Sequence, residues 1–182
     1  AAALSIIDTG YTYTTTVYKY GDSLFLVGGG DPDLSLKSLD SLAQIVSEYK
    51  GSFNSLILDD TFYDDQRLGD GWMWDEGSWW YAAHISALSV NDNCVDFYIS
   101  PNALGLPAKI QTYPNTQYIN VINRSMTVND NTDFEKFKIE RDWGNQSNLF
   151  SVSGFLLNTS PTDTIYRNVN DPTLFTGTVF KE

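Results

Sequence analysis

The amino-acid sequence predicts an α+β fold, in which an α/β layer that opens in the order β-β-α-β carries an inserted, mainly antiparallel β subdomain. Two observations lead to this class. Two strand-like runs, an amphipathic helical pattern and a third apolar strand follow one another within the first 60 residues. From Asn102 onward, short strand-like runs alternate with turns of Asn, Asp, Gly and Pro. We therefore expect an α/β domain over 1–101, a β-rich subdomain over 102–160 and a return segment over 161–182.

The opening elements each have a local signal. The run Tyr11–Tyr20 is dense in β-branched and aromatic residues, which favour a strand. Gly21-Asp22 predicts a hairpin turn into a second strand. Apolar residues then recur at helical spacing between a Ser35 cap and Gly51, and the apolar run 55–58 predicts the third strand. The first residues, Ala-Ala-Ala-Leu, look like the end of a longer helix, so we expect an excised fragment.

The later part of the chain reads as strands followed by a helix. Cys94–Ile99 alternates between apolar and polar residues, as a half-buried strand does. Asp171-Pro172 is a typical start for a last helical segment. The other strand-like segments are Lys109–Tyr113, Gln117–Ile122, Phe134–Arg141 and Leu149–Leu157.

Composition excludes several classes of function. Eleven basic and 23 acidic residues give a net charge of −12, which opposes binding to nucleic acid and to anionic membranes. No apolar run is long enough for a membrane span, so a soluble globular protein is expected. One Cys and one His exclude a disulfide framework and the common zinc sites, and no motif calls for a cofactor.

A Trp-rich run, Gly71–Asn93, carries the strongest functional signal. It holds four of the five Trp, the only His and several carboxylates. The aromatic side chains could plug one end of a sheet, which we expect for Trp72 and Trp74 because aromatics are usually buried. Alternatively they could line a ligand groove. Trp79, Tyr81 and Glu76 lie among Gly and Ser, and we expect them to be exposed.

Other chemistry finds weaker support. His84 lies between apolar residues, where a structural role is common, and no Gly-x-Ser-x-Gly motif supplies a nucleophile. Calcium is compatible with Asp59-Asp60 and 91–93, although the spacing does not match a calcium loop. Paired carboxylates could serve a glycosidase, but their separation is not visible in a sequence. The candidates are Asp59, Asp60, Asp64, Asp65, Asp75 and Glu76.

The order of several motifs resembles the class C penicillin-binding proteins, the D-alanyl-D-alanine carboxypeptidases/endopeptidases of bacterial cell-wall maintenance. The resemblance covers nearly the whole chain and is strongest from Gly28 to Asn93. The motifs that carry it are GGGDPDLS at 28–35, LILDDTFYDD at 56–65, GWMWDE at 71–76, YAAHISALSVNDN at 81–93, a Pro-Asn-x-x-Gly stretch at 101–105 and YINVIN at 118–123.

The resemblance implies an insert of the catalytic domain rather than the domain itself. In that family a long insert separates the Ser-x-x-Lys motif from the Ser-x-Asn motif, and this sequence is similar to the insert alone. The Ser-x-x-Lys match at Ser47 falls in the last turn of its helix, where the dipole would not activate a nucleophile. No Lys-Thr-Gly exists in the chain. We therefore expect no catalytic residue here, and an inactive chain whose parent is a serine carboxypeptidase located in the periplasm or otherwise outside the cytoplasm.

The resemblance also implies a substrate contact and two partners. The partners are the catalytic domain of the parent chain and the peptidoglycan stem peptide, whose amine-bearing side chain the family receives at the mouth of the active site. By position, Glu76 matches the acidic contact and Tyr81 the aromatic one, with Asp75, Trp74 and Trp79 beside them. The rival interpretation is a stand-alone carbohydrate-binding module that uses the Trp-rich loop as a sugar platform.

Overall fold

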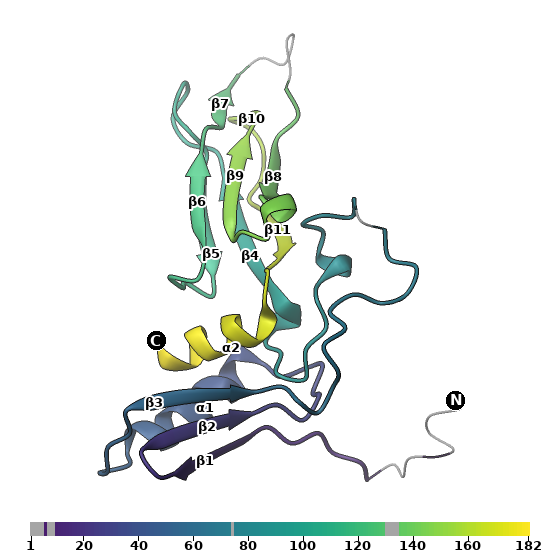
Figure 1. The fold of residues 1–182 in the computed structure, drawn as a ribbon. Coiled ribbons are helices and arrows are strands. Elements are labelled where there is room, and N and C mark those ends of the chain that lie inside the picture. Colours follow the sequence, from purple (N-terminus) through teal and green to yellow (C-terminus); the bar gives the residue numbers. More distant parts are fainter. Residues whose placement is uncertain (1–5, 7–9, 74, 130–134) are drawn as a thin grey trace.

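The computed structural model describes residue 6 and residues 10–73, 75–129 and 135–182. It has two parts, seen in Figure 1 as a lower α/β layer and an elongated β module standing on it, with helix α2 between them. The fold is α+β, as the sequence predicts. Ala1–Leu4, expected to end a helix, lies outside the described residues.

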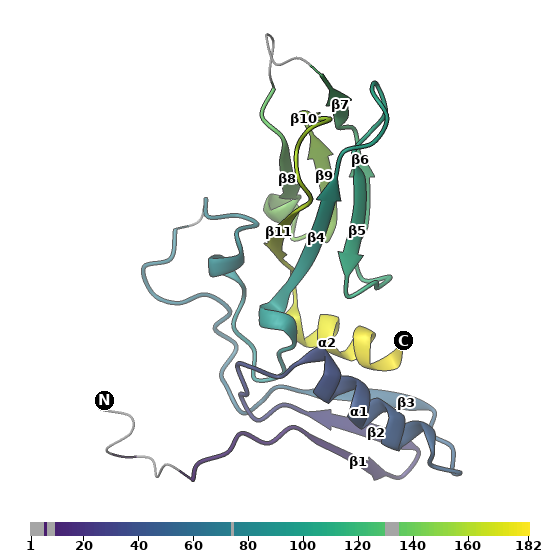
Figure 2. The ribbon, with the colours of Figure 1, turned by 180° about the vertical axis from the view of Figure 1, so that it is seen from behind.

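The α/β layer has the predicted order β-β-α-β. Strands β1 (Thr16–Tyr20) and β2 (Ser23–Val27) form an antiparallel hairpin, and β3 (Ser55–Asp59) runs parallel to β2. The parallel pairing follows from the crossover helix α1 (Leu36–Ser47), which lies against one face of the sheet (Figure 2). The Ser35 side chain caps α1, as expected, by accepting a hydrogen bond from the Ser38 amide at 3.1 Å.

The β module contains three small sheets. The first has the order β11-β4-β5 and is antiparallel, the second β6-β9-β8 and the third β10-β7. Phe97 of β4 and Phe150 of β9 meet in the core with ring centroids 5.0 Å apart. The strands are β4 (Cys94–Ser100), β5 (Lys109–Tyr113), β6 (Asn120–Asn123), β7 (Met126–Val128), β8 (Lys138–Arg141), β9 (Leu149–Ser153), β10 (Phe155–Leu157) and β11 (Asp163–Asn168).

Several sequence-based expectations need correction here. Of the five strand pairings among the described residues of the module, three are antiparallel, as expected, but β6 pairs parallel with β9 and β10 parallel with β7, which was not predicted. The predicted single strand 149–157 is broken at Gly154, which has φ +84° and lets the chain change sheets. The strand predicted from Tyr11 begins only at Thr16, and strands β7 and β11 were not predicted. The pairing of β4 with β5 and β11 connects the ranges 1–101, 102–160 and 161–182 within one sheet. The division of the chain into these three domains stays a prediction.

Helix α2 (Pro172–Lys181) connects the two parts of the molecule. The Asp171 side chain caps it by accepting a hydrogen bond from the Leu174 amide at 3.0 Å, as Asp-Pro at a helix start predicts. Gly177 packs on Leu58 of β3 so closely that an added Cβ would lie 2.4 Å from its side chain. Among the described residues, no helix combines the length and the hydrophobicity needed to span a bilayer.

The glycine run after β2 lets two backbones cross. The Gly28 amide donates to the Asp59 carbonyl at 2.8 Å, and the Gly30 amide donates to the Ala87 carbonyl at 2.9 Å. A Cβ on Gly28 would lie 2.2 Å from the Ala87 carbonyl oxygen, a contact that only a backbone shift could relieve. The run therefore joins the segment around Ala87 to the α/β layer rather than forming a free turn.

This crossing gives a test of the fold. Gly28→Ala should destabilise the chain by about 3 kcal/mol, because its methyl group meets backbone rather than a movable side chain. Gly144→Ala is the matched control, since a Cβ there meets nothing within 4 Å. Urea denaturation followed by circular dichroism measures both variants. Equal stability of the two would contradict the crossing.

Candidate functional site

The aromatic loop, residues 71–83 apart from residue 74, projects beside the β module (Figure 1). The side chains of Trp79, Trp80 and Tyr81 are 47%, 57% and 51% exposed. The rings of Trp79 and Tyr81 are parallel within 9° with centroids 6.2 Å apart, and Trp80 meets Tyr81 edge-on at 5.9 Å. The loop thus offers an ordered aromatic surface rather than scattered rings.

The plug interpretation is wrong for Trp72. Its side chain is 39% exposed, and its indole lies over the backbone of Gly69 within the same excursion of the chain. In Figure 1 the segment 60–83 extends outward instead of closing the end of a sheet. Trp74, the other residue expected to plug the sheet, lies outside the described residues.

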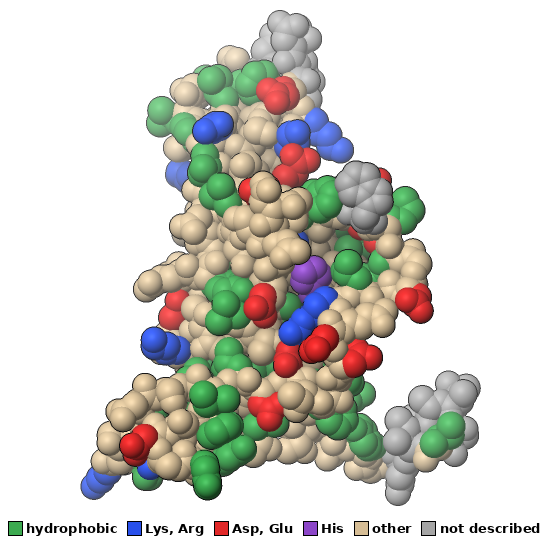
Figure 3. Space-filling view, in the orientation of Figure 1, with side chains coloured by type: hydrophobic (Ala, Val, Ile, Leu, Met, Phe, Trp, Pro, Cys, Tyr) green, Lys and Arg blue, Asp and Glu red, His purple; other side chains and the backbone are tan. Residues whose placement is uncertain are grey.

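The segment that carries the aromatic side chains is rich in acidic residues. Segment 59–81 contains seven Asp and Glu residues and a single cation, Arg67. Asp75 is exposed, and Glu76 is half-buried with its Oε2 accepting a hydrogen bond from the Met73 amide at 3.3 Å. Figure 3 shows acidic and hydrophobic side chains together on this side of the molecule. The loop therefore combines negative charge with aromatic faces, a combination suited to a cationic ligand.

A buried amide anchors the loop to the β module. Asn168, the last residue of β11, is fully buried, and its Nδ2 lies 3.1, 2.8 and 3.0 Å from the carbonyl oxygens of Gly77, Trp79 and Ala82. Its backbone amide donates to the Ser78 carbonyl at 3.1 Å. Arg141 of β8 donates from Nε to the Asn168 Oδ1 at 3.1 Å. One residue thus contacts four carbonyls of the loop.

A neighbouring arginine supports the loop from the same strand. The guanidinium of Arg167 lies 4.5 Å from the ring centroid of Trp79, and its Nε donates to the Ile139 carbonyl at 2.6 Å. Arg167 and Trp79 also face each other as an isolated antiparallel bridge. Because this cation covers one face of the Trp79 indole, that face is not open to a ligand.

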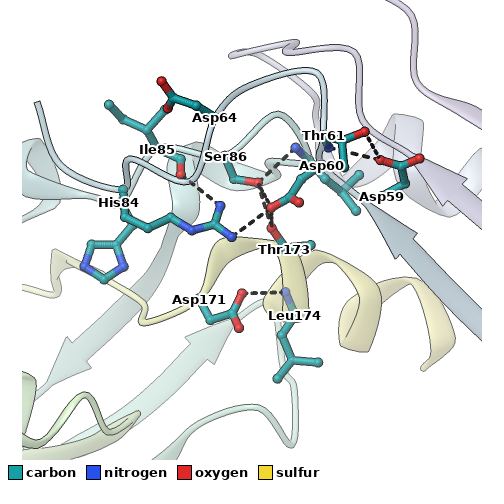
Figure 4. A network of polar contacts seen from close by, with 12 residues as sticks. Asp59, Asp60, Thr61, Asp64, His84, Ile85, Ser86, Asp171, Thr173 and Leu174 are labelled. Carbon is teal, nitrogen blue, oxygen red and sulfur yellow. Dashed lines mark hydrogen bonds and ion pairs between the residues drawn. The ribbon is translucent and has the colours of Figure 1, made fainter.

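A polar network fixes the base of the segment that carries the loop (Figure 4). Asp60 Oδ2 lies 2.9 Å from Arg67 Nη2 and accepts a hydrogen bond from Thr173 Oγ1 at 2.5 Å. Ser86 Oγ lies 2.8 Å from Thr173 Oγ1, and Arg67 Nη1 donates to the Ile85 carbonyl at 3.2 Å. The network connects the end of β3, the N-terminus of α2 and the segment after the loop.

The charge state of Asp60 follows from this network. Burial alone would raise the pKa of its carboxyl, but the hydrogen bonds from Thr173 and Arg67, together with the positive charge of Arg67, outweigh it and hold the pKa below 3.8. Asp60 is therefore ionised at neutral pH. Its role is structural, and the same holds for Asp59, whose Oδ1 accepts hydrogen bonds from the amide and hydroxyl of Thr61.

The described residues contain no assembled nucleophile and base. Figure 4 shows the His84 ring pointing away from Ser86, and its imidazole has no hydrogen-bond partner in the described part of the chain. Burial, helped by the charges of Arg141 and Arg67, lowers the pKa of His84 below 6.5, so the ring is mostly neutral at pH 7. Ser47 is the last residue of α1, in its last turn as predicted, and its hydroxyl donates to the Gln44 carbonyl.

Two further features do not contribute to the site. Within residues 10–73, 75–129 and 135–182, no group of three or more His, Cys, Asp or Glu side chains could hold a metal ion. A groove of about 1110 Å³ lies between α1, β3 and α2, lined by residues such as Val46, Leu56 and Phe180. Its lining also includes Gln117 and Tyr118 of the β module, and it has no lining residue in the aromatic loop.

Comparison with known families decides the affiliation. The profile of the D-Ala-D-Ala carboxypeptidase 3 (S13) family matches residues 1–182. The chain belongs to this family. It is 30% identical over 198 residues to the D-alanyl-D-alanine carboxypeptidase of Actinomadura sp. strain R39, a match that covers 100% of this chain and 36% of that protein. It is also 30% identical over 92 residues to penicillin-sensitive carboxypeptidase A of Dictyostelium discoideum, covering 46% of this chain and 18% of that protein.

Solved structures share the fold of this carboxypeptidase family member. Penicillin binding protein 4 of Haemophilus influenzae superposes with a TM-score of 0.65 at 17% identity, covering 93% of this chain and 38% of that one. Its complex with a β-lactam gives a TM-score of 0.61 at 16% identity and covers 99% and 39%. The chain thus spans little more than a third of these proteins, and neither comparison supports the carbohydrate-binding alternative.

The Asp60 network provides a second test. Asp60→Asn should destabilise the chain by about 1–2 kcal/mol at pH 7, because the ion pair with Arg67 is lost. The pKa of Asp60 is lowered in the folded state, so its carboxylate stabilises the fold above pH 3.8 and this contribution disappears as the pH falls through the lowered pKa. The difference between variant and wild type should therefore shrink in acid. Urea titrations at several pH values measure it.

Asp64→Asn is the control for this substitution. Asp64 is exposed and uses one oxygen to accept a hydrogen bond from the Gln66 amide, which an Asn side chain can also accept. Its stability should stay within about 0.5 kcal/mol of wild type at every pH. A loss at pH 7 that is the same for both variants would contradict a specific role of Asp60.

Proposed function

We propose that this chain is a non-catalytic insert domain of a bacterial D-alanyl-D-alanine carboxypeptidase/endopeptidase, a penicillin-binding protein that acts outside the cytoplasm in peptidoglycan maturation. A catalytic domain of the same protein supplies the nucleophile and hydrolyses the terminal D-Ala–D-Ala bond. The insert shapes the entrance of that active site. Family membership over residues 1–182 supports the assignment to such a carboxypeptidase.

The observation that carries the proposal is the aromatic loop itself. Its exposed Trp79 and Tyr81 rings stand beside Asp75 and Glu76 in a segment of strongly negative charge. A carboxylate can pair with the ammonium group of a stem-peptide side chain while an aromatic face covers its methylenes. Trp74, placed in the same contact by the sequence, lies outside the described residues.

The expected free energy of the contact between the loop and the ammonium group indicates that the contact gives selectivity rather than tight binding. An exposed ion pair contributes about 0.2–1 kcal/mol and an exposed cation–π contact about 0.5–1 kcal/mol. Together they amount to about 1–2 kcal/mol, or about 5–30-fold in affinity. Such a contribution selects among peptides and is too small to bind one tightly by itself.

The preference for a stem peptide with a free side-chain amine tests the proposed contact with the aromatic loop. In the whole carboxypeptidase, kcat/KM should be about 5–30-fold higher for a stem peptide with a free side-chain amine than for the same peptide acetylated on that amine. Glu76→Gln and Tyr81→Ala should each remove much of this ratio. Glu48→Gln is the matched control, because Glu48 is exposed at the end of α1, far from the loop in sequence. An unchanged ratio in both loop variants would refute the contact.

The non-catalytic role has its own test. The chain alone should remain unlabelled when incubated with a fluorescent penicillin and examined by denaturing gel electrophoresis, because acylation needs an activated serine. A penicillin-binding carboxypeptidase with its catalytic serine serves as positive control. Covalent labelling of the folded chain, abolished by prior denaturation, would overturn the proposal.

A further inference from the structure

We propose that Asn168 is the positioning residue of the aromatic loop, holding its backbone so that Trp79 and Tyr81 keep one orientation toward the substrate. Asn168 does not reach the ligand itself, since it is fully buried beneath the loop. The consequence for substrate selectivity rests on the proposed function. The control of loop geometry by Asn168 does not rest on the proposed function, and it can be measured separately.

The contacts of Asn168 are concentrated on the loop. Its Nδ2 reaches the carbonyls of Gly77, Trp79 and Ala82, and its backbone amide bonds to Ser78. These carbonyls bracket the turn η2 (Trp80–Ala82), which contains Trp80 and Tyr81. A short turn of this kind has few internal hydrogen bonds of its own. Its orientation is therefore decided by the group that binds its carbonyls from below.

Arg141 decides which end of the Asn168 amide faces the loop. A guanidinium can only donate hydrogen bonds, so the Arg141 Nε at 3.1 Å requires an oxygen at that position. The Nδ2 end is thereby directed toward the three carbonyls. A flipped amide would place its oxygen against those carbonyls and its N–H groups against Arg141. Arg141 is itself held by the Ser147 carbonyl at 3.1 Å and is 4% exposed.

The loop also fits closely on the module around this amide. Gly77 adopts φ +59°, and a Cβ there would lie 2.8 Å from the Trp143 Nε1. Arg167, the preceding residue of β11, lies against Trp79. Asn168 thus lies within a contact between the loop and the β module. The other parts of this contact are Gly77 against Trp143 and Trp79 against Arg167.

The substitution Asn168→Asp separates positioning from general stability. An Asp side chain has nearly the same shape but only oxygen acceptors, so it repels the three loop carbonyls. The same carboxylate attracts Arg141 and preserves the link between β8 and β11. The loop should be released while the module under it stays folded. Asn148→Asp is the matched control, because Asn148 also bonds through both ends of its amide, to the backbone of Asn170, without touching the loop.

The first measurement is hydrogen exchange of the chain, followed by mass spectrometry. In Asn168→Asp, the amides of the peptide covering 77–83 should exchange at least 10-fold faster than in wild type, while those of β4 and β9 stay protected. Asn148→Asp should leave the loop unchanged. If Asn168→Asp does not fold, Asn168→Ser replaces it, since a hydroxyl can still donate to one carbonyl and should give a smaller increase. Unchanged exchange in a folded Asn168 variant overturns the proposal.

The second measurement is selectivity in the whole carboxypeptidase. Asn168→Asp should lower the preference for the free amine by about as much as Glu76→Gln does, through a higher KM for the amine-bearing peptide. A merely structural defect would lower kcat for both the free and the acetylated peptide equally. If loop exchange rises but neither Asn168→Asp nor Glu76→Gln changes the preference, the positioning role stands and the proposed amine contact fails. If only Glu76→Gln changes it, the positioning proposal fails.

Discussion

The exposed aromatic surface depends on hydrogen bonds that buried carbonyl groups of the same loop must make. A loop without regular structure leaves carbonyl groups without partners, and each one that is buried unpaired costs about 1–3 kcal/mol. In residues 71–83 the carbonyls that face the β module are met by the side chain and backbone of Asn168. Satisfying them turns the opposite side of the loop, with Trp79 and Tyr81, toward solvent. The orientation of these exposed rings is thus a consequence of the hydrogen bonds made beneath the loop.

The same strand end fixes the two parts of the molecule to one another. Two residues after Asn168, the backbone of Asn170 pairs with both ends of the Asn148 amide, and Tyr118 Oη lies within 3.0 Å of the carbonyls of Asn170 and Asp171. Thr173, three residues after Asn170, binds Asp60 at the end of β3. Six consecutive residues therefore contact the loop, the β module and the α/β layer in turn, so the position of the loop is tied to both parts.

The sequence predicted those features whose causes are local. The Ser35 cap, the hairpin at Gly21 and the Asp171 helix start were correct because each depends on neighbouring residues. The parallel pairings and β11 were missed, since pairing partners leave no mark in either strand alone. The exposure of Trp79 and Tyr81 was predicted from surrounding Gly and Ser, but that of Trp72 was not. Asn168 had no local signal at all, because its partners lie 27 to 91 residues away.

The energy of the loop contacts limits the role that the loop can have in the proposed enzyme. The carboxylate and aromatic contacts of a half-exposed loop amount to about 1–2 kcal/mol, whereas enzymes lower reaction barriers by about 8–23 kcal/mol. Under the proposed function, the loop therefore changes which peptide is accepted and does not provide the rate of cleavage. A contribution this small requires side chains that are already ordered, because ordering a mobile side chain on binding costs about 0.5–1.5 kcal/mol and would offset much of it. A rigid anchor such as Asn168 is then the condition under which weak surface contacts can give selectivity.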